Sequence, residues 1–417
     1  MSAASIARQC CVVGGGPAGM MLGFLLARAG VSVTVLEKHA DFLRDFRGDT
    51  VHPSTLELMF ELGLLDEFLA LPHSKVEYLS AEIGGERVRM IDLRHLPTHC
   101  KYVALMPQWD FLNFIAKQGR RYQTFDLHMR AEATDLIEEE GRIVGVRVRT
   151  PQGELSVRAD LIVGCDGRHS TLRARAGMQS DDFGAPMDVL WFRVTRKQSD
   201  PPEAFGHIDA GMMLVMLDRG EYWQCAYVIP KGGVDRVKSE GIEAFRSRVC
   251  TLSPFLGDRL GEVRSFDDVQ LLRVIVDLLR QWWRPGLLLI GDAAHAMSPI
   301  GGVGINIAVQ DAVAAANRLA GPLRDGRVKP ADLQAIQRRR VWPARMTQRV
   351  QLLMQNGIIG PALKAVRRPK PPVAFRLLNA VPPLQRIPAR LLALGFRPEH
   401  IHTPDALAGA AAPPKAW

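Results

Sequence analysis

The chain has 417 residues, of which 47% are hydrophobic, and its formal net charge is +9. A chain of this size can bury a large core, and we expect two lobes around one cofactor rather than three independent domains. The basic residues are dispersed and do not alternate with aromatic ones, which argues against a nucleic-acid-binding protein.

Three features bear on the cell compartment. The sequence contains no run of about 18 uncharged apolar residues, so we expect no transmembrane segment. Its first ten residues, MSAASIARQC, lack the successive basic, apolar and small-residue regions of an export signal. The six cysteines are scattered, which favours a reduced chain. We therefore expect a cytoplasmic protein, and no metal site.

The first motif is the stretch CVVGGGPAGM at 11–20. A short apolar strand over 10–13 leads into it, and apolar residues at helical spacing follow it. Gly14, Gly16 and Gly19 have the G-x-G-x-x-G spacing of a nucleotide-binding turn. The first glycine permits the tight turn, the second lets the backbone approach a pyrophosphate, and the third lets the helix pack on the strand. Free N–H groups at the helix N-terminus can bind the phosphates.

A second strand follows this helix. Gly30 is expected to end the helix, 31–36 has the character of a buried parallel strand, and Glu37 comes at its carboxyl end. A carboxylate in that place can accept hydrogen bonds from both hydroxyls of a ribose. The pattern predicts a dinucleotide site without choosing between NAD and FAD, and the alternative is a βαβ unit with incidental glycines.

Two later stretches also place a turn after an apolar strand. DLIVGCDGRHSTLRARAG, at 160–177, ends its strand in Asp166 and Gly167, and a helix is expected to start near Ser170. LLLIGDAAHAMSPIGGVGINIAVQDAVAAANRLA, at 287–320, ends its strand in Gly291 and Asp292 and continues into a Pro/Gly loop and an Ala-rich helix.

Other segments favour strands. The residues 142–149 and 154–158 alternate around Pro151-Gln152-Gly153, which predicts a hairpin. Three stretches, 187–195, 212–217 and 222–229, alternate or run apolar and are typical of a sheet.

The GGGPAG, CDG and GDAAH-x-x-x-P-x-x-G-x-G-x-N segments, in this order and at these separations, resemble those of the class A FAD-dependent aromatic hydroxylases, the flavoprotein monooxygenases related to p-hydroxybenzoate hydroxylase. The resemblance implies an α/β fold with a Rossmann-type FAD-binding lobe, an inserted β-sheet substrate lobe and a C-terminal helical segment. The predicted domains are a discontinuous FAD-binding domain at 1–75, 102–180 and 275–360, a substrate-binding β-sheet domain at 76–101 and 181–274, and a helical tail at 361–417.

The resemblance implies roles at the adenosine end of FAD. Glu37 would hold the ribose, Arg47 would lie by the pyrophosphate, and Gln108 would contact the linker. Asp166 and Gly167 would lie beside both FAD and an incoming nicotinamide cofactor. Ordinary structural roles are the alternatives: a surface ion pair for Arg47, an N-cap or turn position for Gln108, and a plain turn position for Asp166.

The third motif is implied to bind the flavin end. Asp292 would accept hydrogen bonds from ribityl hydroxyls. The N–H groups of 302–306 would face the flavin pyrimidine edge, where a helix N-terminus stabilises negative charge on reduced flavin. The full implied cofactor-binding set is Gly14, Gly16, Pro17, Ala18, Gly19, Glu37, Lys38, Arg47, Gln108, Asp166, Gly167, Gly291, Asp292, Pro299, Gly302, Val303, Gly304, Ile305 and Asn306.

The implied reaction is a hydroxylation driven by NADH or NADPH. The nicotinamide reduces FAD, O2 adds to form a flavin C4a-hydroperoxide, and its distal oxygen transfers to an electron-rich ring. The loop at Pro299 would help to exclude water, and the Pro299 carbonyl would face the substrate. Ser298 is a departure from the family pattern. Histidine titrates near neutrality, which makes His295 a candidate catalytic base, although its place in the GDAAH segment favours a structural hydrogen bond.

The substrate is expected to be a bulky phenolic, polyketide-like or quinone-type aromatic compound. Apolar residues of the substrate lobe are candidates to contact it, although sheet packing explains each one at least as well. These candidates are Met187, Trp191, Met212, Met216 and Tyr227.

Three other functions stay open. A flavin-dependent halogenase would resemble G-W-x-W-x-I-P, where this chain has YWQCAYVIP. A flavin-dependent reductase or dehydrogenase would act on a lipid-like substrate without oxygen insertion, and a non-catalytic protein would keep FAD as a structural or sensory group. No second glycine-rich Rossmann motif is present in the sequence, which agrees with transient nicotinamide docking.

The segment after Gly360 combines prolines, arginines and short apolar helices. We expect it to cap the active site or pack within the molecule, ahead of forming a dimer interface or contacting a membrane surface. The protein is expected to be a monomer or homodimer.

Overall fold

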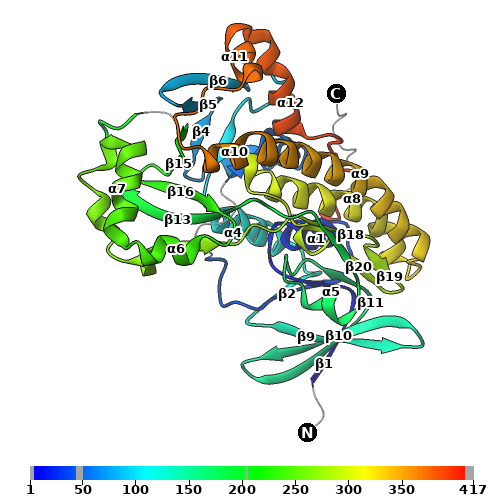
Figure 1. Cartoon of the computed structure of the whole chain (residues 1–417). Helices are drawn as coiled ribbons and strands as arrows, with labels where there is room; N and C mark the ends of the chain where they lie inside the picture. Colours follow the sequence, from blue (N-terminus) through cyan, green and yellow to red (C-terminus); the bar gives the residue numbers. More distant parts are fainter. Residues whose placement is uncertain (1–3, 44–49, 202–204, 409–417) are drawn as a thin grey trace.

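The computed structural model describes residues 4–43, 50–201 and 205–408. Its larger part is built on an eight-stranded sheet in which β20, β11, β1, β2 and β8 lie side by side and run parallel (Figure 1). The strands of this sheet are β1 (Ala4–Val13), β2 (Val33–Glu37), β8 (Phe125–Met129), β9 (Glu132–Glu139), β10 (Arg142–Thr150), β11 (Gly153–Gly164), β19 (Trp283–Arg284) and β20 (Leu287–Leu289).

The longer helices cover this sheet. The helix α1 packs against α4 and α8, and α9 packs against α8. Ten of the twelve residues of α1 are buried, as its apolar sequence requires, so its N-terminal end is held firmly at the edge of β1. The helices are α1 (Pro17–Arg28), α2 (Pro53–Glu61), α3 (Leu65–Leu69), α4 (Gln108–Gly119), α5 (Thr171–Arg175), α6 (Val234–Ser239), α7 (Ile242–Leu252), α8 (Gly304–Arg324), α9 (Pro330–Met354), α10 (Gly360–Lys364), α11 (Val373–Ala380) and α12 (Arg386–Leu394).

A second, seven-stranded sheet forms the other lobe, in the order β17-β13-β16-β15-β14-β5-β6. Strands from two separate parts of the chain meet in it, because β14 pairs in parallel with β5. Its strands are β5 (Tyr78–Ile83), β6 (Glu86–Asp92), β13 (Met187–Thr195), β14 (Phe205–Asp209), β15 (Met212–Asp218), β16 (Tyr222–Pro230) and β17 (Gln270–Leu272). The predicted α/β fold class, with an inserted sheet lobe, is confirmed, while the exact domain boundaries stay a prediction.

The structure also has two small sheets besides the two large ones. A three-stranded sheet has the order β3-β7-β4, and β12 pairs with β18. Their strands are β3 (Thr50–Val51), β4 (Ser74–Val76), β7 (Val103–Leu105), β12 (Ser180–Asp182) and β18 (Asp277–Leu279).

The predicted hairpin is present, but its second strand is longer than expected. The residues after Gly153 pair with β10 and run without a break to Gly164, so the hairpin strand and the strand before Asp166 are one element, β11. The same strand pairs with β1 along almost all of its length. The turn at Asp166 is therefore fixed by the central strand pair of the main sheet.

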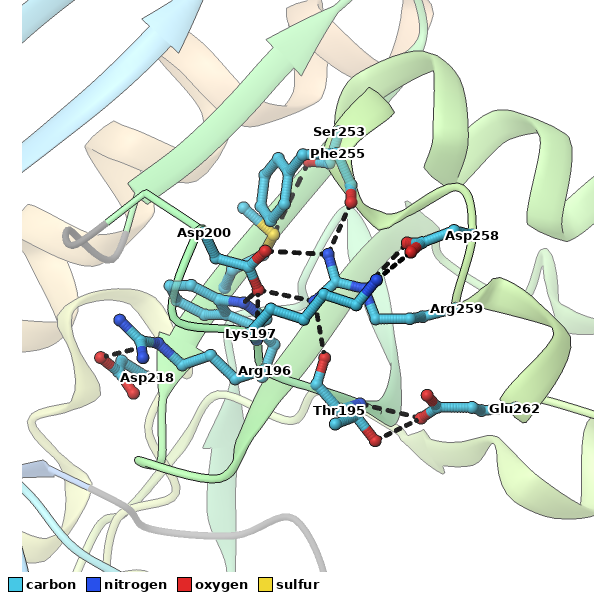
Figure 2. A network of polar contacts seen from close by, with 12 residues as sticks. Thr195, Arg196, Lys197, Asp200, Asp218, Ser253, Phe255, Asp258, Arg259 and Glu262 are labelled. Carbon is cyan, nitrogen blue, oxygen red and sulfur yellow. Dashed lines mark hydrogen bonds and ion pairs between the residues drawn. The ribbon is translucent and has the colours of Figure 1, made fainter.

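A buried ion pair links separate parts of the second lobe (Figure 2). Both guanidinium NH groups of Arg259 donate to Asp200, at 2.6 and 2.9 Å, and the indole N–H of Trp223 donates to the same carboxylate at 2.8 Å. Arg259 also donates to the backbone carbonyls of Thr195 and Phe255. The pair thus links the end of β13 to the turns that follow α7.

The C-terminal helices pack on the second lobe. Ala389 and Ala393 of α12 lie in a small apolar core with Leu93 and Leu96, and α11 packs on β6. The end of α12 reaches the loop before α8, where a Cβ on Gly301 would lie 2.7 Å from a methyl group of Leu392. The tail therefore packs within the molecule, the arrangement ranked first from the sequence.

Candidate functional site

The three glycines of the first motif differ in what surrounds them. Gly14 has a φ of +106°, and a Cβ there would lie 2.3 Å from the carbonyl oxygen of Cys165. A Cβ on Gly19 would lie 1.9 Å from the Gly14 carbonyl oxygen. Gly16 is the N-cap of α1, and a Cβ there would meet no atom of the described residues within 4 Å. Positions 14 and 19 must be glycine because a side chain there would clash with the backbone. Gly16 instead borders open space in front of a helix N-terminus, where a pyrophosphate fits.

Glu37 lies beside this turn, at the end of β2. Its side chain is buried, and its carboxylate accepts hydrogen bonds from the backbone N–H groups of Gly15, at 2.9 Å, and His39, at 3.0 Å. These bonds fix the carboxylate, and carboxylate oxygens have lone pairs for more than one donor, so the arrangement suits a ribose. Lys38, the next residue, is exposed.

The two later turns meet the first one at the same edge of the sheet. A Cβ on Gly291 would lie 3.1 Å from the Cβ of Ala18, so the third motif packs on the first turn of α1. Arg168, just after the second motif, donates to Asp292 at 3.3 Å. The three motifs, which are far apart in the sequence, thus converge on the N-terminal end of α1.

Within the second motif, Asp166 has a structural partner. Its carboxylate accepts hydrogen bonds from the Ser170 hydroxyl, at 2.6 Å, and from the backbone N–H of Leu172, at 3.1 Å. These bonds hold the first turn of α5, and burial raises the pKa of Asp166. Gly167 follows with a φ of +84° and open space at its Cβ position, as judged from the described residues. The turn role considered for Asp166 therefore has direct support in the structure.

The N-terminus of α8 is anchored by Asn306. Its amide oxygen accepts hydrogen bonds from the His52 N–H, at 2.9 Å, and from the Thr55 hydroxyl, at 2.7 Å. A Cβ on Gly302 would lie 2.3 Å from the Thr50 hydroxyl oxygen, which instead donates to the Gly302 carbonyl. The Asn306 side chain is therefore used to hold the loop.

Backbone groups remain for a ligand at the start of α8. The cap residue is Val303, whose side chain cannot accept a hydrogen bond from the first N–H groups of the helix. A Cβ on Gly304 would meet no described atom within 4 Å. The N–H groups near Gly304 and Ile305 thus form a second helix N-terminus suited to partial negative charge, such as a flavin pyrimidine edge.

His295 belongs to a buried polar network. It is 1% exposed, and its Nε2 lies 2.5 Å from a carboxylate oxygen of Asp311, which also accepts from the Gly291 N–H and from Arg340 Nε. Burial alone would raise the pKa of Asp311, but His295 and Arg340 outweigh it and hold that pKa below its usual value. Arg340 also donates to Glu399 in the C-terminal segment. This placement agrees with the structural role favoured for His295.

The structure gives a reason for Ser298, the departure from the family pattern. Ser298 is buried, its hydroxyl accepts a hydrogen bond from the Gln355 amide at 2.8 Å, and its carbonyl accepts one from Gln351 at 2.9 Å. Gln351 also donates to the carbonyl of Ile300. The residues around Pro299 are therefore fastened to the end of α9, a set of contacts that no local sequence pattern indicates.

The structure says less about two predicted FAD contacts, Gln108 and Arg47. Gln108 is half-buried and is the first residue of α4, one position after the N-cap Pro107, so it is neither the N-cap nor a turn residue. Arg47 lies outside the described residues. Both roles in FAD binding stay predictions.

The five predicted substrate contacts do not lie together. In the strand register Trp191 pairs with Ala226, and Tyr227 pairs with Leu190, so Trp191 and Tyr227 point to opposite faces of the second sheet. Met216 and Tyr227 are buried in the core under α7, and Met212 packs against that core. Only Met187 and Trp191 lie on the face that packs against Ile300.

That other face is the better candidate for a substrate wall. Its apolar members include Met213, Val215 and Trp191, which are only partly buried, and its neighbour Ile300 belongs to the Pro299 loop. This face also carries two hydrogen-bond donors, the indole N–H of Trp191 and the amide nitrogen of Gln224, which share a face by the strand register. Both are buried and have no hydrogen-bond partner among the described residues. Sequence reasoning missed Gln224, Met213 and Val215 because the relative register of β13, β15 and β16 was unknown.

Comparisons with known proteins agree with this architecture. Residues 7–350 match the family model described as "FAD binding domain". The chain is 32% identical over 384 residues to a 6-methylpretetramide 4-monooxygenase of Streptomyces rimosus, covering 91% of each chain. It is 30% identical over 313 residues to a rifampicin monooxygenase of Streptomyces venezuelae, covering 72% of this chain and 61% of that one.

The fold is also that of a solved structure. A p-nitrophenol 4-monooxygenase from Pseudomonas putida superimposes with a TM-score of 0.76 at 21% identity, covering 94% of this chain and 100% of that chain.

Proposed function

Because this chain belongs to the FAD-binding-domain family and is an FAD-dependent monooxygenase, we propose that it hydroxylates a bulky aromatic substrate of the phenolic or polyketide type. The family expected from the three motifs is thereby confirmed. The named relatives act on 6-methylpretetramide and on rifampicin, which supports a large polycyclic or polyketide substrate over a small benzoate.

The observation that carries the proposal is the convergence of three turns on one helix N-terminus. Gly16 leaves space before α1, Glu37 lies beside it, and Asp292 is brought to the same edge by the packing of Gly291 on Ala18. Bound FAD supplies the redox chemistry that activates O2. The chain supplies the binding groups: N–H groups for the phosphates and the pyrimidine edge, and carboxylates for the ribose and ribityl hydroxyls.

The face of the second sheet that carries Trp191 is proposed to hold the substrate. Its apolar residues exclude water, while Trp191 Nε1 and Gln224 Nε2 can each donate one hydrogen bond. Buried donors without partners favour a substrate that presents oxygen acceptors, such as the phenolate and keto groups of a polyketide. The electron donor is proposed to be NADH or NADPH, docking transiently beside the turn at Gly167.

The proposal is tested by isotope incorporation. Purified protein loaded with FAD is incubated with NADPH or NADH, a panel of phenols and polycyclic aromatics, and isotopically labelled O2. The expected product has gained one labelled oxygen atom. A reductase would instead convert its substrate without O2, so product formed under anaerobic conditions, or product without label, contradicts the proposal.

A further inference from the structure

One segment of the chain carries basic residues without any acidic ones, although the basic residues of the whole chain are dispersed. Between Asp332 and Glu399 the sequence contains thirteen arginine and lysine residues and no aspartate or glutamate. The net charge of the whole chain is +9, so the remainder is net acidic. This segment includes α11 and α12.

The same segment exposes large apolar side chains. Of the twelve large hydrophobic residues that are exposed in the described part of the chain, six lie between 366 and 391. On α11 the exposed fractions are 74% for Val373 and 52% for Leu377, and on α12 they are 62% for Ile387 and 39% for Leu391. Val366, in the preceding link, is 94% exposed. Such clustering marks an interaction surface rather than scattered surface residues.

The opposite faces of these helices are firmly attached. Phe375 of α11 packs against the apolar core of β5 and β6, and the Asn379 side chain accepts a hydrogen bond from the Arg89 N–H at 3.1 Å. Ala389 and Ala393 of α12 are buried on the other side of β6. Figure 1 shows α11 at the top of the molecule, next to β6, with α12 just below it. The exposed apolar residues are therefore presented by fixed helices.

Cations surround these apolar residues. Arg376, Arg386 and Arg390 are exposed, and the structure places no carboxylate partner within ion-pair distance of them among the residues it describes. Arg368 does have one, Asp209 at 3.3 Å. The adjacent hairpin of β5 and β6 carries charges of both signs, with Glu82 and Glu86 beside Arg87 and Arg89. The surface thus keeps a positive excess next to aliphatic side chains.

We propose that the outward faces of α11 and α12 dock on an anionic lipid surface. Short helices with aliphatic and basic residues lie in the interface of a bilayer, with the aliphatic groups among the acyl chains and the arginines at the lipid phosphates. A symmetric dimer through this face would bring like charges together, which opposes self-association. Among the described residues no helix is long and apolar enough to span a bilayer, so the contact is peripheral.

Vesicle flotation of the full-length, FAD-loaded protein tests this proposal. We expect binding to vesicles of phosphatidylcholine with phosphatidylglycerol, no binding to phosphatidylcholine alone, and a loss of binding as salt rises. Replacing one arginine near an anionic surface lowers affinity about fivefold, so the pair Arg376→Gln and Arg390→Gln should lower it about 25-fold. The pair Leu377→Ser and Ile387→Ser should abolish binding.

Matched controls lie elsewhere on the surface. Leu407→Ser removes a leucine that is 59% exposed, and Arg236→Gln removes an exposed arginine of α6; both should bind as the parent does. Thermal melting and retained FAD verify that each variant is folded. The proposal is overturned if the parent does not bind anionic vesicles, if it binds neutral ones equally, or if the α11 and α12 variants bind unchanged. It is also overturned if the parent is a dimer that the leucine and isoleucine variants dissociate.

Discussion

Arg340 Nε lies 2.8 Å from a carboxylate oxygen of Asp311, and the two residues are 2% and 0% exposed. This buried pair links α9 to α8, and through the Gly291 N–H it also fixes the turn that carries Asp292. An ion pair this deep is costly to break, because the remaining charge stays buried without its partner.

Arg340→Met should therefore destabilise the fold by about 3–5 kcal/mol, measured as the free energy of unfolding in urea. Arg338→Met is the matched control, since Arg338 is an exposed residue of the same helix and its loss should change stability by less than about 0.5 kcal/mol. Equal stability of the two variants would contradict the claim that the pair of Arg340 and Asp311 stabilises the fold.

A second prediction separates the glycines of the first motif. Gly16→Val should leave the protein folded, because Gly16 has an ordinary φ of −77° and open space around its Cβ position within the described structure, yet the new side chain stands where the pyrophosphate is proposed to lie. FAD affinity, measured by fluorescence titration, should fall at least 100-fold with little change in melting temperature.

Gly14→Val should behave differently. Its φ of +106° and the Cys165 carbonyl at 2.3 Å make any side chain strained, so this variant should fail to fold or melt far lower. An exposed glycine away from the site, Gly261, provides the control for valine substitution. Full FAD binding by folded Gly16→Val protein would refute the pyrophosphate assignment.

Much of the fold follows from local patterns. The strand predicted at 187–195 has those bounds as β13, because alternating apolar residues pack one face under α7. The helix start near Ser170 is also right, since the Ser170 hydroxyl caps α5 by accepting from the Arg173 N–H. These features depend on residues only a few positions apart.

Other features depend on contacts that sequence patterns do not encode. Alternation alone cannot say whether Trp191 and Tyr227 share a face, because that is decided by the register between β13 and β16. The pair of Asp311 and Arg340 joins residues 29 positions apart, and Arg340 lies outside every motif. Both were missed for the same reason: tertiary geometry selects among residues that look equivalent in the sequence.

The third prediction concerns acid. Burial of the Asp200 carboxylate raises its pKa, but hydrogen bonds from Arg259 and other donors (Figure 2) outweigh this effect and lower the pKa from 3.8 to about 2. A pKa lowered by folding stabilises the protein above the unfolded pKa, and this stabilisation is lost as pH falls through the folded value.

The ionised Asp200 should thus contribute about 2 kcal/mol above pH 5, with about half of that gone near pH 3. Urea unfolding of the parent and of Asp200→Asn, from pH 6 to pH 3, measures the difference between them, which should narrow as pH falls. A difference that stays constant or widens would show that the carboxylate is not the titrating group. Asp258→Asn, which alters an exposed partner of Arg259, is the control.

The last prediction uses the two faces of the second sheet. Trp191→Phe removes one buried donor from the proposed substrate wall, and the loss of a hydrogen bond worth about 1 kcal/mol should raise the substrate dissociation constant about fivefold. Tyr227→Phe removes a hydroxyl from the opposite face, under α7, and should leave that constant unchanged. Both constants can be read from the change that substrate makes in the flavin absorption spectrum, independently of turnover. An effect of Tyr227→Phe that matches or exceeds that of Trp191→Phe would place the substrate on the other side of the sheet.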